Sequence, residues 1–421
     1  SLGMLPRILM VLRRHGMEPL LQDLTFPVHR PDALNPVWAE MTRPEFREWR
    51  YRQWECTLQI VNSMGGIIDA CTGFGKTELI ARCCRLYPAA KIAVVAKERE
   101  VLDTIYSRLC GIVGDVGIVH GQKHDFKRVT VYSAKSLHHA EDDIDLVFGD
   151  EAHQLAAEDL KTKTHYAFPN ARRFGLTANP NDRLDGCSTR LEYLFGPIIF
   201  HLPIDEATQN GLVTPVQVRW LNMKLRHNPM VGLNSDHGRA KFGIWKNRER
   251  NQIIADTARK HEGEQILIAV EKFEHGAHLL KLLPDFVLVS GTPDSTLVQK
   301  LKNEHVLPHD YEPITNKQKA VYRKQFEAGT LRKAIATDVW STGVDFRQLS
   351  VLIRADARSS GIIDTQLPGR LTRLHDGKQV GVLYDCWDVF DDRLKRKSQE
   401  RSRRYAKKNW EQDRRSITEA L

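Results

Sequence analysis

A glycine-rich loop at residues 70–77 limits what this chain can fold into more than any other feature of its sequence. The loop reads Ala-Cys-Thr-Gly-Phe-Gly-Lys-Thr and follows a short apolar run. Gly73 and Gly75 allow the backbone to curl, so that its N–H groups can face phosphate oxygens. Lys76 would then place a positive charge at the β- and γ-phosphates, and Thr77 would offer its hydroxyl to Mg²⁺. The loop therefore predicts a strand, a phosphate-binding turn and a helix in succession.

A second polar segment, Asp-Glu-Ala-His at residues 150–153, follows the apolar run Leu146-Val147-Phe148. Such a run suits a buried parallel strand, and carboxylates at its carboxyl end can reach a metal ion. Asp150 would hold Mg²⁺, and Glu151 would orient or deprotonate the attacking water. The loop alone could be an ordinary turn, because Ala70 replaces the first glycine of the general pattern, and the acidic pair alone could be a solvated strand end. Their occurrence in this order, each after an apolar run, favours a site that binds ATP and Mg²⁺.

The chain alternates between apolar, β-branched runs and helical stretches, which is typical of parallel sheets covered by helices. In the first half, strands are expected at 92–96, 116–119, 129–132 and 146–148. Residues 223–243 are polar and rich in Gly and Asn, which is typical of a linker. The alternation then restarts, with strands expected at 265–270, 286–290, 333–337, 351–354 and 380–384. We predict an α/β fold with domains at 46–222 and 223–390, a small N-terminal appendage at 1–45 and a basic, helical C-terminal tail at 391–421.

The charge of the chain suits a polyanionic partner, because its net charge is +9. Between Arg393 and Lys408, Glu400 is the single acidic residue among many Lys and Arg, so this stretch is either a solvated face or a contact with nucleic acid. The seven cysteines include no C-x-x-C pair, and no apolar run approaches the roughly 20 residues that span a bilayer. We expect a cytoplasmic protein without a membrane partner.

Two arginines three residues apart lie in the second expected domain, in the segment Gln366-Leu367-Pro368-Gly369-Arg370-Leu371-Thr372-Arg373. On a helix such residues share a face, and both guanidinium groups could point at a γ-phosphate held by the first domain. The alternative is a surface helix with ordinary ion pairs. The segment 336–345 favours the first interpretation, because it runs from an expected strand into a Ser-Thr-Gly turn that could present polar groups to a ligand. ATP would then lie between the domains, and its hydrolysis would let them open.

With these four segments in this order, the chain resembles a superfamily 2 DEAH-box helicase. Within that superfamily it is most similar to the branch of the XPB-like repair helicases and the phage UvsW-type branch-migration DNA helicases. The resemblance runs from about residue 46 to residue 390. It implies two RecA-like parallel-sheet motor domains, movement in the 3′-to-5′ direction, and forked or branched DNA as substrate. With the compact form of the chain, it also implies that the cytoplasm is bacterial or that of a phage-infected host. It also covers Gly175-Leu176-Thr177-Ala178-Asn179-Pro180, the motif that couples hydrolysis to movement, where Asn179 replaces a threonine that is frequent in the family.

The motifs and the resemblance together assign roles to individual residues. Catalysis is assigned to Lys76, Asp150, Glu151, Gln366, Arg370 and Arg373. Nucleotide binding is assigned to Arg50, Gln53, Thr72, Gly73, Gly75, Lys76, Thr77, Gly343 and Asp345, of which Gln53 and Arg50 would recognise the base. The metal ion is assigned to Thr77 and Asp150, and nucleic-acid contacts to Lys97, Ser133, Lys135, Ser136 and Thr337.

The interpretation that we favour is a monomeric ATP-dependent DNA helicase or translocase that works in recombination, replication or repair. It would act on single-stranded, forked or branched DNA, with residues 1–45 as a candidate DNA-binding segment. One alternative is an RNA helicase, since the Asp-Glu-Ala-His box also occurs in RNA-acting relatives. Another is a nucleic-acid-binding ATPase that serves as a clamp or partner switch without unwinding. A motor joined to a nuclease is disfavoured, because no carboxylate cluster typical of a metal-dependent nuclease stands outside the motor domains.

Overall fold

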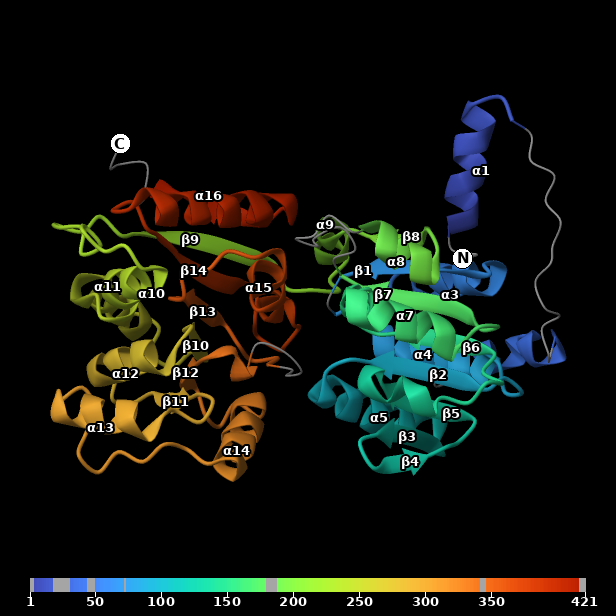
Figure 1. The fold of residues 1–421 in the computed structure, drawn as a ribbon, viewed down its shortest axis with the longest axis horizontal. Coiled ribbons are helices and arrows are strands. Elements are labelled where there is room, and N and C mark those ends of the chain that lie inside the picture. The colour runs from blue at the N-terminus through green and yellow to red at the C-terminus, as the bar shows by residue number, and fades with distance from the viewer. Residues whose placement is uncertain are drawn as a thin grey trace. The chain divides into compact units, whose positions relative to one another are not determined.

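The computed structural model describes residues 4–17, 31–43, 50–71, 73–178, 188–340 and 346–415. The chain forms two compact units, Ser1–Leu212 and Val213–Leu421. Each unit is built on its own sheet, flanked by helices (Figure 1). The predicted fold class, two α/β domains with parallel sheets, is therefore confirmed.

The first unit contains an eight-stranded sheet in the order β4-β3-β5-β2-β6-β7-β1-β8. All of its pairings are parallel except that of β4, which runs antiparallel to β3 at one edge. All five residues of β2 are buried, which explains why this strand reads as a continuous apolar run rather than as an alternating pattern. The strands are β1 (Gly65–Ala70), β2 (Ile92–Ala96), β3 (Val116–His120), β4 (Lys123–Asp125), β5 (Val129–Ser133), β6 (Leu146–Gly149), β7 (Arg172–Thr177) and β8 (Ile198–Leu202).

Helices connect these strands and complete the core of the first unit. Val95, Val147, Phe168 and Phe195 are among the buried side chains that pack together there. The helices that follow the N-terminal segment are α3 (Gln53–Asn62), α4 (Lys76–Leu86), α5 (Arg99–Val113), η4 (Ala134–His139), α6 (Ala152–Leu155), α7 (Glu158–Ala167), α8 (Ser188–Phe195) and α9 (Ile204–Gln209).

The described residues of the N-terminal segment form three short helices, α1 (Leu5–Arg14), η2 (Pro31–Leu34) and η3 (Trp38–Thr42). The last of these is held against α4. Glu40 accepts a hydrogen bond from Arg85 at 3.1 Å, and the Val37 N–H donates to the carbonyl of Leu86 at 2.8 Å. On α1, Arg7 forms an ion pair with Glu192.

The second unit contains a seven-stranded, fully parallel sheet in the order β11-β12-β10-β13-β14-β9-β15. Its strands are β9 (Val216–Asn222), β10 (Ile266–Ala269), β11 (Val287–Val289), β12 (Lys333–Ala336), β13 (Val351–Arg354), β14 (Gly381–Trp387) and β15 (Glu411–Asp413). Its helices are α10 (Asp236–Ala240), η5 (Lys241–Trp245), α11 (Arg248–Arg259), α12 (Phe273–Leu282), α13 (Ser295–Asn303), α14 (Asn316–Glu327), η6 (Asp338–Trp340), α15 (Gly361–Gln366), η7 (Pro368–Thr372) and α16 (Asp392–Lys407).

The boundary between the units lies at Leu212/Val213 rather than at residue 222. Strand β9 belongs to the second sheet, because each of its residues pairs with a residue of β14. The stretch expected as a linker, 223–243, contains α10 and the start of η5.

The basic segment 391–421 is also part of the second unit over its described residues. Helix α16 buries Leu394, Arg401 and Tyr405, and β15 adds an edge strand beside β9. The segment is therefore a structural element of this unit and not a tail appended to it. Among the described residues, no helix has the length and apolar character needed to cross a bilayer.

Candidate active site

Three polar segments of the first unit meet at one edge of its sheet. The phosphate loop follows β1, Asp150 and Glu151 follow β6, and Thr177 ends β7. Strand β7 lies between the other two, pairing Asp69 with Thr177 on one side and Gly149 with Gly175 on the other. Since all three strands are parallel, their carboxyl ends lie together, where ligands of α/β sheets bind.

The backbone of the loop has the curled form that its glycines predict. Gly73 and Gly75 have φ values of 100° and 84°, a region that side chains other than glycine seldom adopt. Gly75 is the residue before α4, so the loop leads directly into the amino end of a helix, which attracts phosphate. Lys76 donates from Nζ to the carbonyl of Ala70 at 3.2 Å. Thr72 lies outside the described residues.

Gln53 and Arg50 hold this loop from the side. The Gln53 Nε2 donates to the carbonyl of Phe74 at 2.6 Å, and the Arg50 guanidinium donates to the carbonyl of Gly73 at 2.6 Å. A Cβ on Gly75 would lie 2.7 Å from Gln53 Nε2, so a side chain there would displace the glutamine. The Gln53 Oε1 is buried and has no partner among the described residues. It is the acceptor with which this side chain could recognise an amino group on a base.

Asp150 and Glu151 form the acidic part of the site. Asp150 is half-buried, and its backbone N–H donates to the carbonyl of Val95 at 2.9 Å. Burial and the neighbouring Glu151 raise the pKa of Asp150 to about 6, although Lys76 opposes the shift. Glu151 has a φ of 45°, a left-handed conformation that costs on the order of 1–2 kcal/mol for a residue with a side chain. Such strain is characteristic of functional positions.

This acidic corner fits Mg²⁺. A cation would offset the repulsion between the carboxylates of Asp150 and Glu151. Mg²⁺ prefers oxygen ligands, such as the carboxylate of Asp150 and the hydroxyl of Thr77 in the first turn of α4. Within the described part of the chain, no group of three or more His, Cys, Asp or Glu could hold a metal ion. The protein would therefore share the ion with phosphate and water ligands.

His153 links the acidic corner to β7, and the sequence analysis did not single it out. Its Nδ1 lies 3.1 Å from the hydroxyl of Thr177 and 3.4 Å from a carboxylate oxygen of Glu151. His153 and Thr177 are both buried. The sequence signals were the fourth residue of the Asp-Glu-Ala-His box and the position of Thr177 in the expected coupling motif. Asn179, which departs from the usual pattern of that motif, lies outside the described residues.

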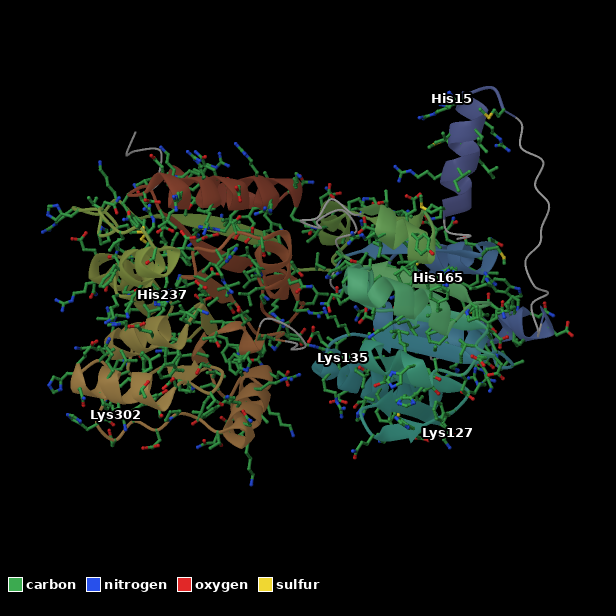
Figure 2. All side chains as sticks on the ribbon, in the orientation of Figure 1. His15, Lys127, Lys135, His165, His237 and Lys302 are labelled. Atoms are coloured by element: carbon green, nitrogen blue, oxygen red, sulfur yellow. The ribbon has the colours of Figure 1, made fainter. Side chains whose placement is uncertain are left out.

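The residues assigned to nucleic acid in the first unit follow β2 and β5, which are neighbours in the sheet. Lys97 comes directly after β2, and Ser133 ends β5 and caps η4 by accepting from the N–H of Lys135. Lys135 is exposed on η4 (Figure 2). Ser136 is buried, with 6% of its surface exposed, so its side chain is not presented on the surface here. In the second unit, Thr337 comes directly after β12 and is half-buried.

The arginine segment of the second unit forms η7, a 3₁₀ helix, instead of an α-helix. Arg370 lies within η7, whereas Arg373 is the residue after it and has extended backbone angles, so the two arginines do not both belong to the helix. The N–H of Arg373 donates to the carbonyl of Arg370 at 3.3 Å. Arg370 is buried, and its guanidinium lies 5.7 Å from the ring centre of Phe346. Gln366 ends α15 and is half-buried, whereas Gly343 and Asp345 lie outside the described residues.

A buried network of ion pairs holds α15 and α16 against the second sheet. Arg354, at the end of β13, is fully buried and binds Asp356 at 3.1 Å and Asp364 of α15 at 2.7 Å. Asp364 also binds Arg404 of α16 at 2.5 Å. Arg401 of α16 in turn pairs with Asp385 of β14 at 2.9 Å. Sequence reasoning missed this network, because a single sequence does not show which of its charged residues are buried.

Comparison with known proteins places this site in a family context. Residues 46–182 match the family described as "Type III restriction enzyme, res subunit". This stretch carries the loop, the acidic corner and β7, and it is less than half of the chain. No curated protein sequence matches the chain at a significant level.

Several solved structures share the fold. A fragment of an HsdR subunit of a type I restriction enzyme from Vibrio vulnificus is 18% identical, with a TM-score of 0.58, covering 82% of this chain. This chain spans only 65% of the length of that fragment. Dbp5 of S. cerevisiae, bound to RNA and ADP BeF3, is 12% identical, with a TM-score of 0.60, covering 91% of this chain and 95% of that one. The restriction-modification enzyme LlaBIII, bound to DNA, is 14% identical, with a TM-score of 0.51, covering 83% of this chain and 29% of its own.

These similarities are too distant to identify a branch of the helicases. The T4 UvsW structure reaches a TM-score of only 0.40 at 15% identity, covering 98% of this chain and 86% of that one, so it does not decide the resemblance to UvsW-type proteins. The DEAH-box and XPB-like branch therefore stays a hypothesis. The res-subunit match covers the phosphate-loop site, and the solved structures share the two-sheet fold of the chain.

Proposed function

We propose that the protein is an ATP-driven motor that moves along DNA and unwinds or migrates forked and branched duplexes. The observation that carries this proposal is the link from the acidic corner to the end of β7. Loss of the γ-phosphate beside Glu151 would alter the contact between Glu151 and His153, and His153 holds the hydroxyl of Thr177 at 3.1 Å. A change at the phosphate would thus reach the segment that the family resemblance assigns to coupling.

The roles of the residues in hydrolysis follow from their positions. Lys76 and the N–H groups at the start of α4 would hold the β- and γ-phosphates, while Asp150 and Thr77 would hold Mg²⁺. The ion would neutralise phosphate charge as it develops. Glu151 would orient the attacking water. Gln53 would bind the base through its free Oε1 while its amide nitrogen keeps the loop in shape.

We propose that Arg370 and Arg373, with Gln366 near them, complete this site from the second unit. The planar guanidinium groups suit a γ-phosphate, and the bond from the Arg373 N–H to the carbonyl of Arg370 links the backbones of the two arginines at the end of η7. The variant Arg370→Ala should fold and bind ATP but lose roughly a thousandfold in turnover, if this arginine acts as a full arginine finger. Turnover at the parent rate would favour the alternative, in which η7 is a structural turn of the second unit and takes no part in hydrolysis.

Contact with nucleic acid would come from Lys97, Ser133 and Lys135 in the first unit and Thr337 in the second. The outer face of α16 offers a further set of cations. Its inner face is occupied by buried residues, whereas Arg396, Lys397, Arg403 and Lys407 are exposed. Exposed cations on a rigid helix suit a phosphate backbone, which binds without sequence preference.

We favour DNA over RNA, and the comparisons leave both open, since LlaBIII was solved bound to DNA and Dbp5 bound to RNA. The experiment is to measure ATP turnover with single-stranded DNA, with RNA of the same sequence, and with neither. Stimulation by DNA alone would support the proposal. Stimulation by RNA alone would favour the RNA-helicase alternative.

Branched substrates test the finer part of the proposal. We expect a Y-fork and a four-way junction to be bound more tightly and unwound faster than a linear duplex, with α16 and the N-terminal segment gripping the arms. In that segment Arg13 and Arg14 lie in the last turn of α1. Removing residues 4–44 should reduce the preference for junctions more than the ATP turnover. A joint loss of turnover and thermal stability would instead show that the segment only supports the first unit, as the contact of η3 with α4 would allow.

A nucleic-acid clamp or partner switch is the alternative of another class. It would hydrolyse ATP in response to nucleic acid but would leave every duplex intact. Strand separation on any of the three substrates excludes it.

A further inference from the structure

The connection between the two units is short and fixed at both ends. On the first unit, the N–H of Gly211 donates to the carbonyl of Thr208 at 3.1 Å, and the N–H of Leu212 donates to that of Ala207 at 2.9 Å. On the second unit, the N–H of Thr214 donates to the carbonyl of Thr372 at 2.8 Å. Val213 separates the two sets of bonds. If the chain bends between the units, the bend would therefore occur mainly in the backbone next to Thr214.

The first anchor of the chain in the second unit is the arginine segment itself. Thr214 is buried, and its hydroxyl donates to the carbonyl of Arg373 at 3.0 Å. Its backbone bond goes to the residue before, Thr372. The next residue, Pro215, accepts at its carbonyl from the N–H of Gly381 at 2.9 Å and so leads into the pairing of β9 with β14. Thr214 is thus the point at which the connection meets η7.

A second side chain holds the same carbonyl. Lys378, which is half-buried, donates from Nζ to the carbonyl of Arg373 at 3.1 Å. Burial and the nearby guanidinium of Arg373 lower the pKa of Lys378 to about 8. The Lys378 side chain comes from the turn after Arg373, in which Gly377 has a φ of 81°. The backbone of Arg373 is therefore held from two directions.

We propose that Thr214 and Lys378 are positioning residues for Arg373, and that Thr214 ties the position of this arginine to the connection between the units. The proposal rests on the function given above, in which Arg373 acts on the γ-phosphate. A rotation at Val213 would pull on the carbonyl of Arg373 through the Thr214 hydroxyl, so that movement of the units and engagement of the arginine become one event.

The chain offers a matched control for the Thr214 hydroxyl. Thr208, in α9 of the first unit, donates from its hydroxyl to the carbonyl of Ile204 at 2.7 Å, within its own helix. Thr214→Val and Thr208→Val make the same chemical change, loss of one hydroxyl bond to a carbonyl. Only the first should change catalysis.

The test measures kcat and KM for ATP in the presence of single-stranded DNA, with the thermal midpoint of each variant. Thr214→Val should lower kcat by about ten- to a hundredfold, because small misplacement of a catalytic group has effects of this size, with KM within about twofold. Thr214→Ser should restore kcat, Lys378→Met should lower it in the same manner, and Thr208→Val should match the parent. Lys378→Met keeps the test decisive if Thr214→Val lowers the thermal midpoint.

The Arg373→Ala variant separates failure of this inference from failure of the proposed function. If Arg373→Ala keeps the parent kcat, the role of the arginine is wrong and the positioning role falls with it. If Arg373→Ala lowers kcat, the double variant with Thr214→Val should be no slower than Arg373→Ala alone. Additive effects of the two substitutions, or a Thr214→Val variant with the kcat of Thr208→Val, would overturn the inference while leaving the arginine in the site.

Discussion

Replacing Asp364 by alanine should destabilise the second unit strongly, because this carboxylate is fully buried between two guanidinium groups. It accepts from Arg354 at 2.7 Å and from Arg404 at 2.5 Å. Removing one partner of a buried ion pair costs roughly 3–5 kcal/mol, since the remaining charge is left without compensation. Arg354 keeps its bonds to Asp356, so we expect about 3 kcal/mol, at the lower end of that range.

An exposed pair in the same unit provides the control. Asp236 and Arg393 approach to 3.3 Å, but their side chains are 95% and 65% exposed. Asp236→Ala should therefore change the free energy of unfolding by no more than about 0.5 kcal/mol. Urea unfolding of the parent and both variants measures these changes in the free energy of unfolding, provided that its slope against urea concentration is the same for all three proteins. Equal free energies of unfolding would refute the view that the buried network holds α15 and α16 on the sheet.

Three further predictions follow from the site and the surface. Lys76→Ala should lower ATP turnover by at least about a hundredfold, because a preorganised charge at the phosphates is lost. Glu151→Gln should bind ATP normally and fail to turn it over. Near-parent rates of phosphate release in both variants would contradict the assigned site. The double variant Arg396→Glu/Arg403→Glu should bind duplex DNA more weakly than the parent, with an unchanged thermal midpoint. The slope of the logarithm of the binding constant against the logarithm of the salt concentration should become shallower by roughly 0.9 for each lost phosphate contact. An unchanged slope would mean that α16 is a purely structural helix. Burial would raise the pKa of Asp356, but Arg354 and Arg358 overcome this effect and hold the pKa at about 2, below its value of 3.8 in the unfolded chain. The carboxylate should therefore contribute about 2 kcal/mol to the free energy of unfolding above pH 3.8, and this contribution should be lost as the pH falls towards 2. Identical acid unfolding of the parent and the Asp356→Asn variant would contradict the prediction.

Much of the fold was predictable, because strands buried on both faces leave continuous apolar runs. The runs at 92–96 and 351–354 coincide with β2 and β13, and the helix after the phosphate loop begins at Lys76. Strand β9 falls in the stretch that was assigned to the first domain, because the sequence pattern there does not show which sheet the segment joins. Its partner, β14, lies more than a hundred residues further along the chain, and no local pattern records that pairing.

The site was predictable where backbone geometry demands a residue type, and less so elsewhere. Gly73 and Gly75 predict a backbone that curls around the phosphates, and their positive φ values agree with that expectation. The basic stretch after residue 390 could not be divided by composition into structural and exposed charges. Arg401 is fully buried against Asp385, whereas Arg403, two residues later, is exposed. Which charge turns inward depends on a carboxylate from a strand elsewhere in the sheet.

The central claim is that ATP hydrolysis drives movement on DNA. The most direct measurement is the time course of strand separation on a forked DNA duplex, with ATP, for the parent protein and for Glu151→Gln. We predict that the parent separates the strands and that Glu151→Gln binds the fork and ATP but separates none. Equal strand separation by both proteins, or none by a parent protein that hydrolyses ATP on the same fork, would contradict it.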